Sequence, residues 1–276
     1  MLIWGKQSTA IQYMKRFYLT NSLMTYHPTD ILKTALYFST KTENHYTSIQ
    51  KFADAIGGTK AEDVLASEFL LTQALRFTFD VRHPYRALDG AIMDMRAIAK
   101  GNVPVLPGGE VPEDRPPHMD NRAQHAQIKA KEWLKTSAQL TDVYFYFTPS
   151  QIMMASLLLA DKELAQWYIR SKFPAIVDPL GHMAKKVLAT VEKCAEMLKT
   201  IPPSSEPSAA EKKELQVLAK KLKKCRNPEK MDLAGLQRAK REGEGEDEKV
   251  VKKRKLEREQ SAKQGEDLFG PEIKKA

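Results

Sequence analysis

The feature that most constrains the fold of this chain is a helical pattern that occurs twice. Leu-Thr-Asn at 19–21 begins nine residues before Pro28, and Leu-Thr-Asp at 140–142 begins nine residues before Pro149. Aligning the two prolines pairs Ile31 with Ile152, Leu36 with Leu157, Phe38 with Leu159 and Lys41 with Lys162. With a two-residue shift, the segment at 64–67 matches that at 187–190. Three matches in the same order predict two tandem modules of one plan.

The apolar residues recur with a helical period, and no segment shows the alternation of a convincing strand. We therefore expect an all-α fold. The expected helices cover about 7–20, 28–41, 47–56, 59–77, 84–99, 121–140, 149–161, 163–172, 180–200 and 207–225. The second module then has five helices. The first has only four, because nothing upstream of its first expected helix matches 84–99.

Several helix starts have identifiable signals. A proline is favoured in the first turn because its missing N–H has no helical partner there. His27 and His83 each precede such a proline, and we expect both to cap the helix that follows. Thr59 and Glu62 have the spacing of a capping box, which predicts that they open the helix at 59–77.

Composition divides the chain further. The first 200 residues hold 24 Lys and Arg against 20 Asp and Glu, whereas the last 76 hold 20 against 15. The expected parts are an N-terminal module at 1–80, a C-terminal module at 81–201, a helical extension at 202–235 and a disordered charged tail at 236–276. The tail has too few apolar residues to offset the entropy of ordering it. A net charge of only +4 in the first 200 residues does not favour direct nucleic-acid binding.

The motifs of common enzymes are absent from the sequence. It contains no phosphate-binding glycine loop, serine-nucleophile elbow, zinc-protease histidine pair or kinase catalytic loop. The six histidines and the two cysteines, Cys194 and Cys225, have neither metal-ligand spacing nor a disulfide framework. No apolar run approaches the roughly 18 residues of a membrane span. We therefore expect no catalytic residue, no metal, no cofactor and no membrane partner.

Two charged residues allow a structural and a functional interpretation. Lys41 ends a helix, where a lysine favourably meets the negative end of the helix dipole. Glu68 lies about 40° from Val64 on the wheel of the helix at 59–77, at the edge of the apolar stripe. The aligned residue of the second module is Val191. Because a buried unpaired charge costs several kcal/mol, Glu68 either reaches solvent, pairs with a lysine inside its module, or lies on a surface that a partner covers.

Two basic clusters in the tail have the spacing of a bipartite nuclear-import signal. An import receptor reads such a signal in an extended segment, and the tail is expected to be disordered. The clusters therefore predict localisation in the nucleus. Their residues are Lys240, Arg241, Lys252, Lys253, Arg254 and Lys255.

Several motifs resemble the cyclin H family, and their residues look like those of its fungal branch. They are YMKRFYL at 13–19, YHP at 26–28, FTFDVRHPYR at 77–86, LTD at 140–142 and YFTPSQI at 146–152. The likeness covers about 7–235. It implies two tandem five-helix cyclin folds, in agreement with the repeat.

The resemblance also implies a function. Members of the family are regulatory subunits, not enzymes. They activate a cyclin-dependent kinase that activates other such kinases and, within general transcription factor H, phosphorylates the C-terminal repeats of RNA polymerase II. The implied partners are the kinase catalytic subunit, an assembly-factor subunit and the transcription factor H complex. In cyclins a lysine ending the third helix and a glutamate in the fifth contact the kinase. The implied kinase-binding residues here are Lys41, Glu68, Glu43, Leu65 and Thr72.

The chain departs from the family at its N-terminus, where family members have two further helices before the one at 7–20. The opening MLIWGK fits the family poorly, which suggests a mis-set start or a spliced variant. We expect an exposed apolar trough on the first module, poor stability of that module, and weak or absent kinase activation. Alternative functions are another transcriptional cyclin, a promoter-binding general transcription factor with the same twin fold, and a scaffold protein. The promoter factor would need a zinc ribbon and a strongly basic body, which the sequence lacks.

Overall fold

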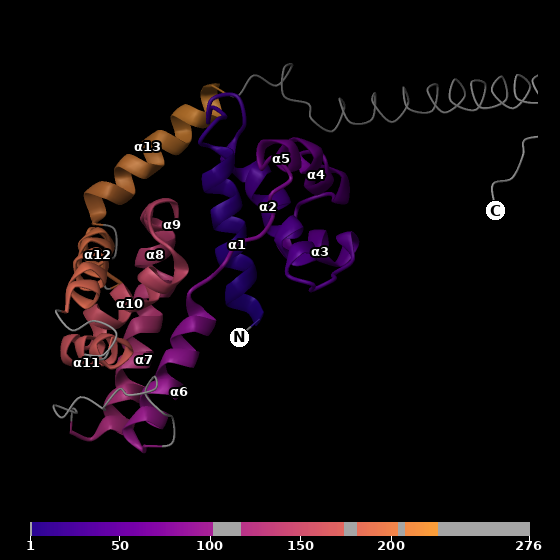
Figure 1. Cartoon of the computed structure of the whole chain (residues 1–276). Helices are drawn as coiled ribbons and strands as arrows, with labels where there is room; N and C mark the ends of the chain where they lie inside the picture. Colours follow the sequence, from indigo (N-terminus) through magenta and orange to yellow (C-terminus); the bar gives the residue numbers. More distant parts are fainter. Residues whose placement is uncertain (1, 102–116, 174–180, 204–207, 226–276) are drawn as a thin grey trace, which may run out of the picture.

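The structure is a computed structural model that describes residues 2–101, 117–173, 181–203 and 208–225. Within these ranges all regular structure is helical, and no strand occurs. The helices are α1 Leu2–Phe17, α2 Pro28–Thr42, α3 Ile49–Ile56, α4 Ala61–Leu65, α5 Glu68–Ala74, α6 Tyr85–Ala99, α7 Met119–Lys135, α8 Ser137–Leu140, α9 Val143–Tyr146, α10 Pro149–Ala160, α11 Lys162–Lys172, α12 His182–Lys199 and α13 Ala209–Cys225 (Figure 1). The expected all-α fold is confirmed for this part of the chain.

The proline signals mark helix starts correctly. Pro28 opens α2, and the His27 ring accepts a hydrogen bond from the Thr29 backbone N–H. Pro149 opens α10, where Thr148 and Gln151 form a reciprocal capping box. Each cap satisfies backbone N–H groups that the first helical turn leaves without a partner.

The buried apolar residues form two clusters. A small one, built from α1, α2 and α5, includes Tyr13, Phe17, Ile31 and Leu71. A larger one is built from α6 to α12, with the apolar helix α10 packed against α6, α7, α11 and α12. The division of the chain at residue 80 stays a prediction.

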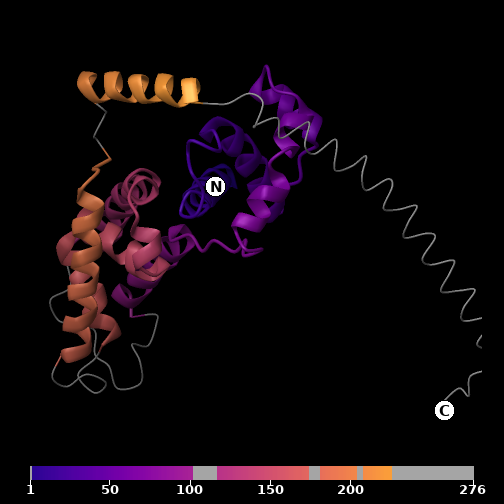
Figure 2. The same ribbon diagram turned by 90° about the horizontal axis from the view of Figure 1, so that it is seen from above.

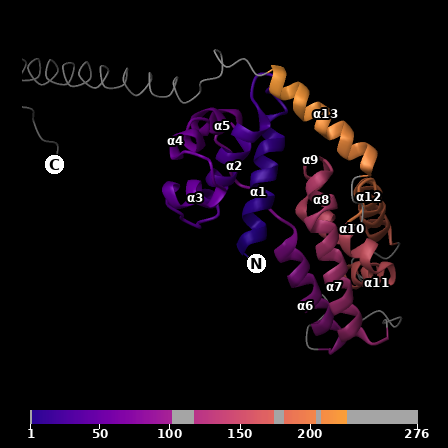
Figure 3. The ribbon, with the colours of Figure 1, turned by 180° about the vertical axis from the view of Figure 1, so that it is seen from behind.

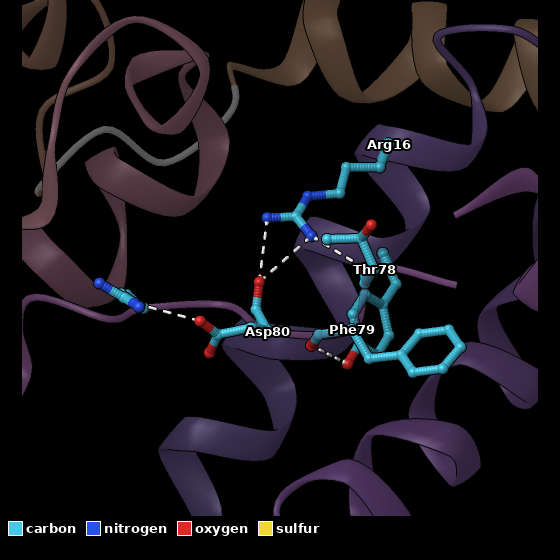
Figure 4. A network of polar contacts seen from close by, with 6 residues as sticks. Arg16, Thr78, Phe79 and Asp80 are labelled. Carbon is cyan, nitrogen blue, oxygen red and sulfur yellow. Dashed lines mark hydrogen bonds and ion pairs between the residues drawn. The ribbon is translucent and has the colours of Figure 1, made fainter. Parts of the chain in front are cut away.

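Helix α1 lies between the two groups of helices, beside α2 on one side and the α7–α9 region on the other (Figures 1 and 3). It also holds the segment that links the groups. The Tyr13 hydroxyl donates to the Phe79 carbonyl at 2.7 Å, and the Arg16 guanidinium reaches the Asp80 carbonyl at 3.4 Å and the Thr78 carbonyl at 3.5 Å (Figure 4). The linker is therefore fixed on α1 through its backbone.

The helix expected at 59–77 is instead two helices, α4 and α5. The Val64 carbonyl, which a continuous helix would use internally, accepts a 2.6 Å hydrogen bond from the Thr34 hydroxyl of α2. The chain turns at Ser67, and α5 begins at Glu68. The expected Thr59–Glu62 box is also wrong, because the Asp63 carboxylate accepts from the Lys60 backbone N–H.

Other boundaries differ from the expected ones. The helix expected at 121–140 is divided between α7 and α8 at Thr136, and α9 was not expected. Helix α13, expected at 207–225, stands apart from the other helices (Figure 2). Its residues Leu215 and Leu218 are 58% and 52% exposed. The predicted tail at 236–276 lies outside the described residues.

Candidate partner-docking site

The predicted pair Lys41 and Glu68 meets in space. Lys41 stands in the last turn of α2, and Glu68 is the first residue of α5. The Lys41 Nζ lies 2.6 Å from the Glu68 Oε1, with the two side chains 38% and 23% exposed. A cation at a helix C-terminus and an anion at a helix N-terminus each meet the favourable end of the helix dipole. The two helix ends and the ion pair therefore stabilise one another.

This geometry decides between the interpretations of Glu68. Its carboxylate pairs with a lysine of its own module, so its charge needs no partner protein. The predicted position of Glu68 on the helical wheel was wrong, because one continuous helix was expected at 59–77 and the structure has two helices there. Glu68 stands at a helix start, where a carboxylate is favoured in any case. The case for docking must therefore rest on the exposure of the pair and on the relatives of the chain.

Aromatic residues hold Lys41 in place. Its Nζ lies 4.8 Å from the centroid of the Tyr37 ring, a cation–π distance. The Tyr37 ring in turn packs against Phe52 of α3, with centroids 5.1 Å apart. Lys41 is therefore oriented by α2 and α3 before any partner arrives, which lowers the entropy cost of a further contact.

The pair retains hydrogen-bonding capacity. A lysine ammonium has three donors and a carboxylate has two acceptor oxygens, and the bond between Lys41 and Glu68 uses one of each. The remaining groups suit backbone carbonyls and N–H groups of another chain. Two large apolar side chains of the same module are exposed, Phe69 of α5 at 51% and Ile56 of α3 at 39%. The arrangement can bind a helix or strand end of a partner.

The other predicted contacts lie in two different places. Leu65 ends α4 and is half-buried. Thr72 stands one helical turn after Glu68, also half-buried, and its hydroxyl donates to the Phe69 carbonyl at 2.8 Å. Glu43 has an intrachain partner instead. Its Oε1 accepts a 2.7 Å hydrogen bond from the Thr9 hydroxyl of α1.

The structure adds a residue that sequence reasoning assigned wrongly. His83 does not cap α6, whose N-cap is Pro84 without a side-chain bond. Its Nε2 lies 2.8 Å from the Thr9 Oγ1, and its Nδ1 lies 3.0 Å from the Tyr144 hydroxyl. Burial lowers the pKa of His83 to about 4, against a smaller raising effect of Glu43. The burial of the polar α1 side chains Thr9 and Gln12, which brings His83 its partner, is visible only in the structure.

Two further expectations concern absences. In the described ranges, no group of three or more His, Cys, Asp or Glu side chains is placed to hold a metal ion. Among the helices described, none is long and apolar enough to cross a membrane. The six predicted import-signal residues of the tail lie outside the described part of the chain.

Comparison with known proteins places the chain in a family. The model of the cyclin C-terminal domain matches residues 83–199. The cyclin CCL1 of Saccharomyces cerevisiae is 33% identical over 168 residues, which cover 61% of this chain and 38% of CCL1. The chain thus spans well under two thirds of the length of this curated relative.

Two solved structures are similar over most of the chain. One is a chain of the CAK complex of Chaetomium thermophilum bound to ATP-γ-S, 40% identical with a TM-score of 0.73, covering 87% of this chain and 71% of that one. The other belongs to the yeast TFIIK (Kin28/Ccl1/Tfb3) complex, 29% identical with a TM-score of 0.55, covering 69% and 74%. The chain therefore belongs to the cyclin family, in the branch that contains CCL1 and cyclin-H.

Proposed function

We propose that this chain is the regulatory cyclin subunit of a cyclin-dependent kinase that acts in transcription and in the activation of other kinases. The observation that carries the proposal is the 40% identity to a chain of the CAK complex, which was solved with the nucleotide analogue ATP-γ-S. A second complex with a similar chain is named for Kin28, Ccl1 and Tfb3. On this proposal the chain itself catalyses nothing, and the chemistry belongs to the kinase.

The proposed mechanism is a shift in population. A kinase is active only when its αC helix brings a glutamate to the catalytic lysine. A cyclin surface that binds this conformation better than others raises its population. Moving an equilibrium from 1:99 to 99:1 requires a differential affinity of about 5.5 kcal/mol. An exposed ion pair supplies only ~0–1 kcal/mol.

The magnitudes therefore assign different roles to the two parts of the surface. At ~25 cal/mol per Å², burying about 200 Å² of apolar surface in the active conformation alone supplies about 5 kcal/mol. We assign this role to Phe69 and Ile56, which are exposed on α5 and α3 of the same module. Lys41 and Glu68 then set the register through hydrogen bonds to kinase backbone groups, with Leu65 and Thr72 at the margin. Glu43 remains a predicted contact, although its bond to Thr9 favours a structural role.

The same proposal includes the setting of the complex. We expect an assembly-factor subunit as a third partner, because the yeast complex is named with Tfb3 beside Kin28 and Ccl1. We expect the nucleus as the site of action. The basic clusters at 240–241 and 252–255 would supply the import signal, which deletion of residues 236–276 would test by the loss of nuclear accumulation.

Affinity purification of the tagged chain from its own cells tests the function. We expect a stoichiometric protein kinase, identified by mass spectrometry, whose substrate is a peptide of RNA polymerase II C-terminal repeats and which this chain activates only weakly. Lys41→Ala and Glu68→Ala should each lower the affinity for that kinase at least tenfold. The matched control is Lys162→Ala, because Lys162 is the exposed counterpart of Lys41 in the second module. Recovery of no kinase, or equal losses for Lys41→Ala and Lys162→Ala, would refute the proposal.

A further inference from the structure

A buried polar chain crosses from the first module to the second. Helix α1 turns three polar side chains, Ser8, Thr9 and Gln12, toward α6 and α8, and all three are buried. A buried polar group without a partner costs about 1–3 kcal/mol. Each of the three has a hydrogen-bond partner from beyond residue 80. The buried polar groups of α1 are therefore satisfied by residues that follow the first module.

The direction of each hydrogen bond in this chain follows from the chemistry of its ends. The Glu43 carboxylate can only accept, so the single hydroxyl hydrogen of Thr9 points to it at 2.7 Å. The Thr9 oxygen must then accept from His83, whose Nε2 lies 2.8 Å away and therefore carries a hydrogen. The other ring nitrogen, Nδ1, is left to accept from the Tyr144 hydroxyl at 3.0 Å. The Tyr144 oxygen accepts from the Gln139 amide at 3.0 Å.

A second proton on His83 would leave the Tyr144 hydroxyl without its acceptor. A hydrogen on Nδ1 would face the Tyr144 oxygen, which already accepts from Gln139, and would displace the Tyr144 hydroxyl hydrogen from its acceptor. Burial acts in the same direction, since it lowers the pKa of His83 to about 4, and the Arg16 charge adds to it. The imidazole is thus neutral at physiological pH, with one tautomer that satisfies every member of the chain.

The chain ends on the turn that carries Lys41. Glu43 is the C-cap of α2, and its backbone N–H donates to the Ser39 carbonyl at 3.0 Å. The next two backbone N–H groups also bond to this turn. That of Asn44 donates to the Lys41 carbonyl at 3.2 Å, and that of His45 donates to the Thr40 carbonyl at 2.8 Å. Helix ends fray unless side chains or packing hold them. The Glu43 carboxylate supplies such a hold two residues after Lys41.

We propose that His83 is a positioning residue for the docking pair: as the Nε2–H tautomer, it ties the C-terminal turn of α2, through Thr9 and Glu43, to Tyr144 of the second module. The second module then sets where Lys41 stands, although it lies outside the pair. The effect on kinase affinity rests on the proposed function; the tautomer and the order of the α2 end do not.

The tautomer is tested by nitrogen-15 NMR of the imidazole in the full chain. We expect the His83 Nε2 at the position of a protonated nitrogen and Nδ1 at that of an unprotonated one, unchanged from pH 7.5 to pH 6. In the Tyr144→Phe variant, Nδ1 should shift as it loses its donor. The opposite tautomer, or a ring that titrates near its ordinary pKa, would overturn the proposal.

The relay is tested by a matched pair at Thr9. Thr9→Val keeps the shape and removes the hydroxyl, whereas Thr9→Ser keeps the hydroxyl. Amide hydrogen exchange at Asn44 and His45 should rise at least tenfold in Thr9→Val and stay within twofold of wild type in Thr9→Ser. Ser8→Ala is the control, because it removes a different bond between the modules, to the Tyr85 hydroxyl at 3.0 Å. Its exchange at these two amides should not change.

The third measurement is the affinity for the kinase catalytic subunit that co-purifies with the wild-type chain. Thr9→Val should lower it about fivefold, a free-energy change of about 1 kcal/mol, and Thr9→Ser should restore it. Unchanged exchange in Thr9→Val would overturn the relay, and so would a loss of kinase affinity in Thr9→Ser or Ser8→Ala as large as in Thr9→Val. If the wild-type chain retains no kinase, the proposed function fails while the tautomer and exchange arms still decide on the relay.

Discussion

The two modules repeat one helical plan but bury very different amounts of apolar surface. The cluster formed by α6 to α12 contains 26 buried apolar residues, whereas that formed by α1, α2 and α5 contains 8. In the second module α6 packs against α7 and α10. Within the described residues, no helix takes the corresponding place in the first module. The second module therefore has the core of an independent unit, and the first depends more on its contacts with α6 and α8.

The difference extends to single aligned positions. Glu68 of the first module is a partly exposed ion-pair partner, whereas its counterpart Val191 is 1% exposed in the core. Lys41 is bonded to Glu68, and its counterpart Lys162 opens α11 on the surface. A duplicated plan can thus use the same position for packing in one module and for a polar surface in the other.

The largest effect on stability is expected when the second module receives the glutamate of the first module at the aligned position. Val191→Glu places a carboxylate among buried apolar side chains, and we expect it to lower the free energy of unfolding of the second module by about 4–5 kcal/mol. Urea denaturation followed by tryptophan fluorescence measures this, because Trp167 lies in that core. A loss below 1 kcal/mol would show that the position can open to solvent.

Aligned core residues should differ next. Ile31 and Ile152 are both fully buried. Ile152→Ala should cost about 4 kcal/mol, since its dense surroundings leave a cavity open, whereas Ile31→Ala should cost about 2 kcal/mol because a smaller core collapses more readily. Denaturation curves of the two variants give the comparison. Equal losses would contradict the claim that the modules differ in packing.

The junction between the modules should weaken in acid. The folded-state pKa of His83, about 4, lies below the ordinary value of about 6.5, so the unfolded chain binds more protons between these pH values. Stability from this group is present above pH 6.5 and is lost as the pH falls toward 4, by an amount on the order of 3 kcal/mol. His83→Gln should flatten this part of the stability profile. The same slope in the variant would assign the acid sensitivity to other groups.

The smallest effect on stability is expected at the docking pair. Glu68→Val gives the first module the residue type of the second and removes a partly exposed ion pair worth ~0–1 kcal/mol. We therefore expect the free energy of unfolding to change by less than about 1 kcal/mol. Circular dichroism melting checks this against Glu68→Gln. A loss of several kcal/mol would make the pair a structural element of the module.

Features encoded by neighbouring residues could be predicted from the sequence. Pro28 and Pro149 mark helix starts because the missing N–H acts within one turn. The break before Glu68 could not be predicted in this way. It depends on the Thr34 hydroxyl, which reaches the Val64 carbonyl across 30 residues of sequence. The role of His83 likewise depends on Thr9 and Tyr144, which meet only when the modules pack.

Hydrogen exchange of the full chain with and without its kinase tests the central claim directly, because it compares the two modules in one experiment. The account predicts slower exchange at the C-terminal turn of α2 and in α5, on either side of the Lys41–Glu68 pair. The aligned segments, the end of α10 and the middle of α12, should exchange at the same rate in both states. Protection confined to α10 and α12, with α2 and α5 unchanged, would contradict it.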